Sequence, residues 1–100
     1  MTEKLERLVA AGIELVPAPS ITTHFIFQRD GFAALVERRG DGFGSIGAAG
    51  LLTEQVGLAP LIWRGDAAFF VGRGFEQAAT ATQSAQLRAF AKDLAEALAS

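Results

Sequence analysis

Two short turn sequences, each set between apolar runs, most constrain what this chain can fold into. The first is Asp30-Gly31, between residues 25–29 and 32–36, and the second is Gly65-Asp66, between residues 61–64 and 67–71. Such dipeptides favour two-residue hairpin loops, because the tight turns that match strand twist need positive φ at their central positions. The pattern therefore predicts two antiparallel β-hairpins.

Two-residue loops also predict the pairing register. The expected partners are Arg29–Phe32, Gln28–Ala33, Phe27–Ala34, Ile26–Leu35, Phe25–Val36 and His24–Glu37 in the first hairpin, and Trp63–Ala68, Ile62–Phe69 and Leu61–Phe70 in the second. Side chains alternate between the two faces of a strand. One face of the first hairpin is therefore expected to carry Phe25, Phe27, Phe32, Ala34 and Val36, and the other Ile26, Leu35 and Ala33.

Helical periodicity marks both ends of the chain. Apolar residues at helical spacing predict a first helix over residues 2–15, ended by Pro17 and Pro19. Thr80 and Gln83 fit a capping box, with Thr82 as a competing N-cap, and predict a last helix of about 18 residues. Its buried face is expected to hold Leu87, Phe90, Ala91, Leu94 and Leu98.

The middle of the chain is rich in glycine. Five glycines between residues 40 and 50 predict a loop, with at most a short strand at residues 45–47. Residues 51–56 form a window too short for periodicity to choose between helical turns and an edge strand, and residues 74–79 are expected to link to the last helix. The predicted fold is a single α+β domain over residues 1–100, with the C-terminal helix packed on the sheet.

This order of elements resembles the small chaperones of type III secretion. Those proteins have a helix, three strands, a middle helix, two strands and a last helix, and they are acidic dimers that bind partner segments. The resemblance implies that residues 45–47 form the third strand and residues 48–56 the middle helix. It also implies a chaperone-like, bacterial type of protein.

Composition excludes several classes of function. The net charge is −2, which does not favour nucleic-acid binding, and the absence of cysteine excludes disulfides and thiolate metal sites. One histidine and scattered acids predict neither a metal site nor a cofactor. No apolar run approaches the roughly 20 residues that span a bilayer, and residues 1–7 do not resemble a signal peptide. We therefore expect a cytoplasmic protein that binds no membrane.

Anion binding is one candidate activity. Residues 42–47 match the glycine spacing of a pyrophosphate loop, although a flexible crossover explains them better because the surrounding strand–helix–strand unit is missing. Arginines 38, 39 and 73 are expected to gather at one end of the sheet, where their guanidinium groups suit carboxylates and phosphates. The candidate ligand-binding residues are Arg38, Arg39, Gly42, Gly44, Ser45 and Arg73; a solvated rim is the simpler interpretation.

Catalysis is disfavoured. The register sets His24 opposite Glu37, and a carboxylate that orients an imidazole is half of many general-base arrangements. No nucleophile accompanies the pair, so a polar cross-strand contact is the better interpretation. We assign no catalytic residue and favour a non-enzymatic function.

The excess of apolar strand residues gives the main functional hypothesis. Both faces of both hairpins are apolar, and two helices do not readily cover both faces of a sheet. We therefore expect a homodimer or a protein-interaction module whose interface includes Phe25, Phe27, Val36, Leu61, Trp63 and Phe70. The alternative is that the helices cover one face each and the monomer is complete.

Overall fold

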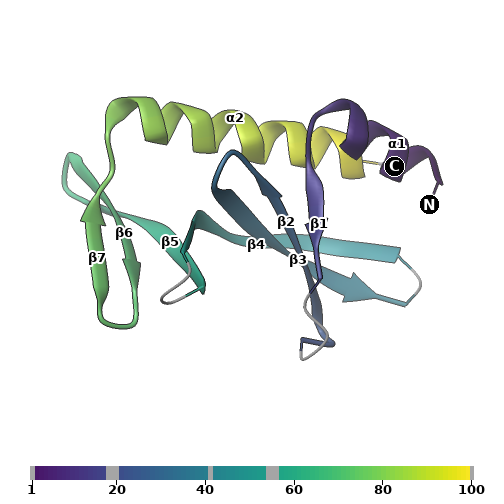
Figure 1. The fold of residues 1–100 in the computed structure, drawn as a ribbon, viewed down its shortest axis with the longest axis horizontal. Helices are drawn as coiled ribbons and strands as arrows, with labels where there is room; N and C mark the ends of the chain where they lie inside the picture. Colours follow the sequence, from purple (N-terminus) through teal and green to yellow (C-terminus); the bar gives the residue numbers. More distant parts are fainter. Residues whose placement is uncertain (1, 18–20, 41, 54–56, 100) are drawn as a thin grey trace.

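The chain folds into an antiparallel seven-stranded sheet with two helices (Figure 1). The computed structural model describes residues 2–17, 21–40, 42–53 and 57–99. The elements are α1 (Thr2–Ala10), β1 (Glu14–Val16), β2 (His24–Arg29), β3 (Phe32–Arg39), β4 (Gly42–Thr53), β5 (Gly57–Arg64), β6 (Ala67–Gly72), β7 (Phe75–Ala78) and α2 (Ala81–Leu98). Each strand pairs with the next one along the chain, in the order β1-β2-β3-β4-β5-β6-β7.

Both predicted hairpins are confirmed, with every predicted pair in register. Strands β2 and β3 pair from Arg29 with Phe32 to His24 with Glu37, and β5 pairs with β6 from Arg64 with Ala67 to Leu61 with Phe70. At the first turn Asp30 has φ 54° and Gly31 has φ 87°, the positive values that the turn sequence predicts. Local turn chemistry is thus sufficient to set the register of both hairpins.

The predicted glycine-rich loop is wrong, because residues 42–53 form the twelve-residue strand β4. Glycine weakens a strand by about 0.5–1 kcal/mol per residue, but β4 pairs with β3 on one side and, at residues 50–53, with β5 on the other. Two register shifts in the β3–β4 pairing absorb the irregularity. The middle helix implied by the chaperone resemblance is also wrong over residues 48–53, and residues 54–56 lie outside the described part.

The first helix is shorter than predicted. It ends at Ala10, and the chain then reverses through Gly12, whose φ of +73° suits glycine far better than any other residue. Leu15, predicted at the end of this helix, and Val16 after it instead pair with Phe27 and Ile26 in the edge strand β1. A second short strand, β7, replaces the link predicted before the last helix.

The last helix begins and ends as predicted. The amide of Gln83 donates to Thr80 Oγ1 at 3.0 Å, and the amide of Thr80 donates to Gln83 Oε1 at 2.9 Å, which completes the capping box. Within the described part, its buried residues are Leu87, Phe90, Leu94 and Ala97. Ala91 and Leu98, also predicted on this face, are half-buried.

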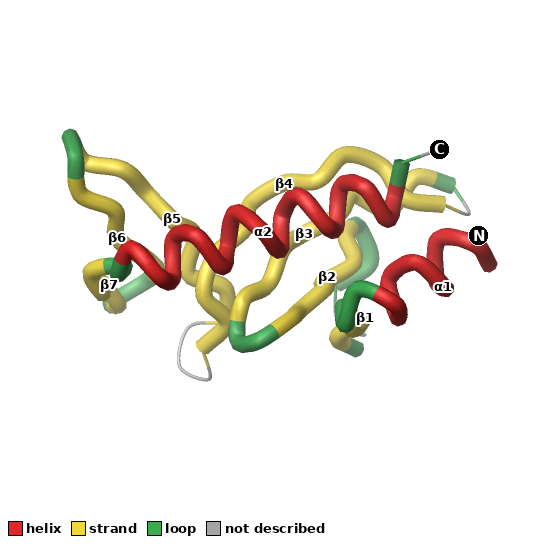
Figure 2. The backbone as a smooth tube through the Cα atoms, turned by 90° about the horizontal axis from the view of Figure 1, so that it is seen from above, coloured by secondary structure: helices red, strands yellow, loops and turns green. Residues whose placement is uncertain are grey.

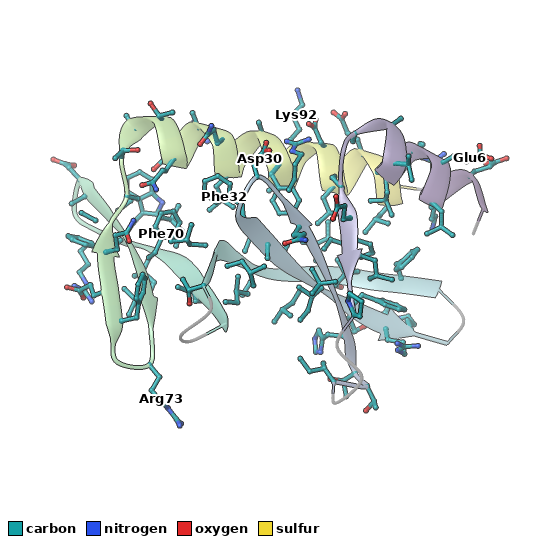
Figure 3. The ribbon with its side chains drawn as sticks, in the orientation of Figure 1. Glu6, Asp30, Phe32, Phe70, Arg73 and Lys92 are labelled. Carbon is teal, nitrogen blue, oxygen red and sulfur yellow. The ribbon has the colours of Figure 1, made fainter. Side chains whose placement is uncertain are left out.

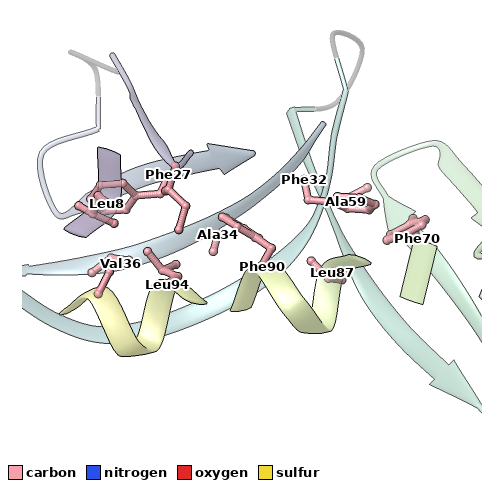
Figure 4. Packing of buried hydrophobic residues seen from close by; sticks show 12 residues of the cluster. Leu8, Phe27, Phe32, Ala34, Val36, Ala59, Phe70, Leu87, Phe90 and Leu94 are labelled. Atoms are coloured by element: carbon pink, nitrogen blue, oxygen red, sulfur yellow. The ribbon is translucent and has the colours of Figure 1, made fainter. Parts of the chain in front are cut away.

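Both helices lie on the same side of the sheet (Figures 1 and 2). Arg7 of α1 reaches the end of α2, where its Nε donates to the carbonyl of Ala97 and its Nη2 to that of Ala99, both at 2.9 Å. The largest fully buried side chains are Phe27, Val36, Phe70, Phe90 and Leu94, and they meet between α2 and the strands (Figure 4). An arrangement with one helix on each face is therefore excluded. Neither helix in the described ranges is long and apolar enough to span a membrane.

Gly50 is required where β4 passes β5. A Cβ built at this position would lie 2.6 Å from Pro60 Cα, closer than real Cβ contacts allow, and backbone has little freedom to move away. We expect Gly50→Ala to lower the free energy of unfolding by about 2 kcal/mol or more, measured by urea denaturation. Gly47→Ala, in the same strand, is the control, because its Cβ would meet only the carbonyl of Leu35 at 3.7 Å. Equal stability of the two variants would contradict this close approach.

The capping box gives a second expectation. Thr80→Ala should lower the free energy of unfolding by about 1 kcal/mol, because the amide of Gln83 loses its side-chain acceptor. Thr82→Ala removes the same atoms two residues later, inside α2, and should change the free energy of unfolding much less. If Thr82→Ala were the more damaging change, the helix would begin at the competing cap.

Candidate functional site

The predicted anion-binding residues gather in the β3–β4 hairpin, with one exception. Arg38 pairs with Phe43 and Arg39 with Gly42, and Gly44 and the exposed Ser45 follow in β4. Arg73 instead lies in the β6–β7 turn, at the other end of the longest axis of the molecule (Figures 1 and 3). The prediction that it joins Arg38 and Arg39 is wrong, because β4 is a full strand that carries the second hairpin away.

The glycine spacing in this hairpin has no phosphate-binding geometry. A pyrophosphate loop places free backbone amides at the start of a helix. Residues 42, 44 and 45 belong to the strand β4, and the next described element is another strand, β5. The pyrophosphate interpretation of residues 42–47 therefore does not apply.

Arg38 differs from the other strand arginines in its partners. Arg29 pairs with Asp93 at 2.8 Å, Arg39 with Glu37 at 2.6 Å and Arg64 with Glu76 at 2.7 Å. The guanidinium of Arg38 lies over the ring of Phe25, 4.2 Å from its centroid, and no carboxylate within the described ranges lies in ion-pairing distance. An exposed cation without a counter-ion is thus held on an aromatic surface.

A groove with a volume of about 660 Å³ opens beside this arginine. Its apolar lining consists of Leu15, Val16, Pro17, Ile21, Phe25 and Ile26, and its polar lining of Thr22, His24 and Arg38. The groove follows from the shortness of β1, which pairs only with Ile26–Gln28 of β2. The chain then leaves the sheet at Pro17, which has no amide to continue the pairing. The start of β2 therefore borders an open, largely apolar groove.

His24 and Glu37 do not form a catalytic pair. Their predicted register is confirmed, but His24 Nδ1 lies 2.9 Å from Thr23 Oγ1, whereas Glu37 Oε1 accepts from Arg39. No hydrogen bond or ion pair joins the two side chains. Across the described residues, no three His, Cys, Asp or Glu side chains come together as a metal site would require.

The side of the sheet away from the helices is called the uncovered face. Because Phe27, Val36 and Phe70 point to the core, their neighbours in the strands point to this side. Its apolar residues include Ile26, Leu35, Ile62, Phe69 and Val71, of which Ile62 is 41% exposed and the others are half-buried, whereas Ala33 on the same face is fully buried. The uncovered face is therefore apolar and partly accessible, most of all at Ile62 in the second hairpin.

Three of the predicted interface residues are unavailable to a partner. Phe27, Val36 and Phe70 are 1%, 0% and 0% exposed, because the helices of the same chain cover them. Phe25 and Leu61 are half-buried against the same core, and only Trp63 is largely exposed, at 55%. The predicted faces were correct, but sequence could not tell which face the helices cover, since both are apolar.

Other accessible apolar residues carried no sequence signal of a site. Leu15 and Ile21 line the groove, although Leu15 was predicted in the first helix and Ile21 in the segment after it. Their role depends on the turn at Gly12, which places β1 beside β2. Only a prediction of that turn could have revealed the groove.

Arg29 holds three elements together, unlike the exposed Arg64. Its Nη1 donates to Asp93 Oδ2 and, at 3.0 Å, to the carbonyl of Ala11, and its side chain is only 18% exposed. We expect Arg29→Gln to lower the free energy of unfolding by about 1.5–3 kcal/mol in urea denaturation, because it leaves part-buried acceptors unpaired. Arg64→Gln, which breaks an exposed pair, should cost under about 1 kcal/mol. A larger loss of stability in Arg64→Gln than in Arg29→Gln would show that Arg29 does not tie β2 to α2 and to the turn after α1.

Comparison with known proteins does not assign the chain to a family. No protein-family model, curated protein or solved structure matches it significantly. The functional argument therefore depends on the geometry of the groove and the uncovered face.

Proposed function

We propose that this chain is a small, non-enzymatic protein-interaction module that forms a homodimer through the uncovered face. The observation that supports this proposal is that both helices lie on one side of a sheet whose two faces are both apolar (Figures 1 and 2). Neither helix covers the apolar side chains on the other side, most of which are half-buried. Large exposed apolar patches are typical of interaction surfaces.

The distribution of polar groups also fits an interface. Polar pairs lie toward the margins of the uncovered face: Glu14 with Gln28 at the β1 edge, Glu37 with Arg39 at the β3–β4 hairpin, and Arg64 with Glu76 at the β7 edge. Between them lie the five apolar residues. Interfaces commonly have such an apolar centre and a polar rim.

A second copy of the chain is the simplest partner. A two-fold axis buries the same patch on both subunits, so one apolar face is sufficient for a closed dimer. Full burial of one large apolar side chain contributes roughly 1.5–3 kcal/mol, so completing the burial of several would favour association. The chaperone resemblance does not contribute to this proposal, because β4 occupies the place of its middle helix.

The test compares two neighbouring substitutions on opposite faces of β5. Ile62→Lys places a charge at the centre of the uncovered face, whereas Trp63→Lys places the same charge on the helix side, at a more exposed position. Light scattering of the wild-type protein should give about twice the mass of the 10.5 kDa chain. We expect Ile62→Lys to be monomeric and Trp63→Lys to remain dimeric, with unchanged far-ultraviolet circular dichroism in both.

Three results would contradict the proposal. A wild-type protein that stays monomeric at high concentration would remove the dimer. Dissociation by Trp63→Lys but not by Ile62→Lys would move the interface to the helix side. Retention of the dimer by both variants would place it at an edge strand or on a helix.

A further inference from the structure

We infer that the groove beside β2 binds an amphipathic carboxylate, a small molecule with one carboxylate and an apolar chain or ring. This site meets the proposed dimer interface at Ile26 and otherwise lies outside it. It lies at the β1–β2 edge, and its cation, Arg38, is on the helix side of the sheet, in the same row as Phe43 and Phe25.

The volume and lining of the groove suit such a ligand. Small-molecule sites are commonly about 300–1,000 Å³, mostly apolar, with few polar groups that set the orientation. This groove has a volume of 660 Å³ and six apolar side chains from β1, β2 and the adjoining chain. An aliphatic or aromatic body would therefore exchange water for apolar contacts along Leu15, Ile21 and Phe25.

The charge at the groove selects an anion. Arg38 lines the groove, is stacked on Phe25, and has no carboxylate partner in the part of the chain that the structure describes. Among the residues that the structure describes, no acidic side chain lines the groove. A guanidinium held in this way presents its N–H groups to a carboxylate, with which it forms charge-assisted, often bidentate, hydrogen bonds.

His24 supplies a second polar contact. Its Nδ1 is engaged by Thr23 Oγ1 at 2.9 Å, and its Nε2 has no partner among the described residues. The imidazole lines the same groove as Arg38. The pairing of His24 with Glu37 puts this side chain on the face opposite Arg38, so the imidazole offers a polar group at the other side of the groove.

The experiment titrates the full chain with octanoate and with 1-octanol, which has the same chain length but no charge, and follows backbone amides by two-dimensional NMR. We expect octanoate to shift the amides of His24 and Ile26 and to bind about tenfold more tightly than octanol. Arg38→Gln should remove this preference, and Arg38→Lys should keep part of it. Arg39→Gln is the matched control, since Arg39 is already paired with Glu37 and does not line the groove.

The inference is overturned if neither probe shifts the groove amides, if octanoate and octanol bind equally, or if Arg39→Gln weakens octanoate as much as Arg38→Gln does. Shifts confined to Ile62, Phe69 and Val71 of the uncovered face would place octanoate on the interface instead, and would also overturn it. Repeating the titration with Ile62→Lys separates the two proposals, because the groove is formed within one copy of the chain. Octanoate binding there is expected whether or not the wild-type protein is a dimer.

Discussion

The structure depends on the contact between one helix and one face of the sheet. Phe90 and Leu94 of α2 reach the row formed by Phe27, Val36 and Phe70, which come from three different strands (Figure 4). Every strand from β2 to β6 and both helices contribute to this single core. Because the same contact draws both helices to one side, it also determines which apolar residues remain accessible. The packing of the helices on one face therefore determines both the core and the candidate interface.

Features that depend on a few neighbouring residues were predictable from the sequence. Asp30-Gly31 and Gly65-Asp66 set the register of two hairpins, and Thr80 with Gln83 set the start of α2. In each case the interaction is made within four residues, so no knowledge of the rest of the fold is needed. The apolar face of α2 followed from periodicity for the same reason.

Features that depend on distant partners were not predictable. The composition of residues 42–50 favours a loop, and only pairing with β3 and β5 makes it a strand. The turn at Gly12 likewise has meaning only because β2 offers an edge to residues 14–16. These two errors had consequences for the candidate site. The first placed Arg73 beside Arg38, and the second hid the groove that Arg38 borders.

The arginines show why residue type alone was a poor guide to the site. Arg29, Arg39 and Arg64 all look alike in sequence, each next to a hairpin turn or a strand end, but each has a carboxylate partner. Arg38 lies beside Arg39 and has an aromatic ring instead. Alternation along β3 sends the two side chains to opposite faces, one toward Glu37 and one toward Phe25. Arg39 is therefore paired with a carboxylate, whereas Arg38, one residue earlier, has no carboxylate partner among the described residues.

The contact between Arg7 and the carbonyl of Ala97 joins residues 90 positions apart, and it has a consequence for how the chain acquires its structure. All seven strands of the described part precede the eighteen-residue helix α2, so the apolar row of the sheet gains its cover only when α2 packs on it. Closing so long a loop is entropically unfavourable and is rewarded only at the end. A segment that holds the strands without α2 would therefore expose the apolar row and would be prone to aggregate.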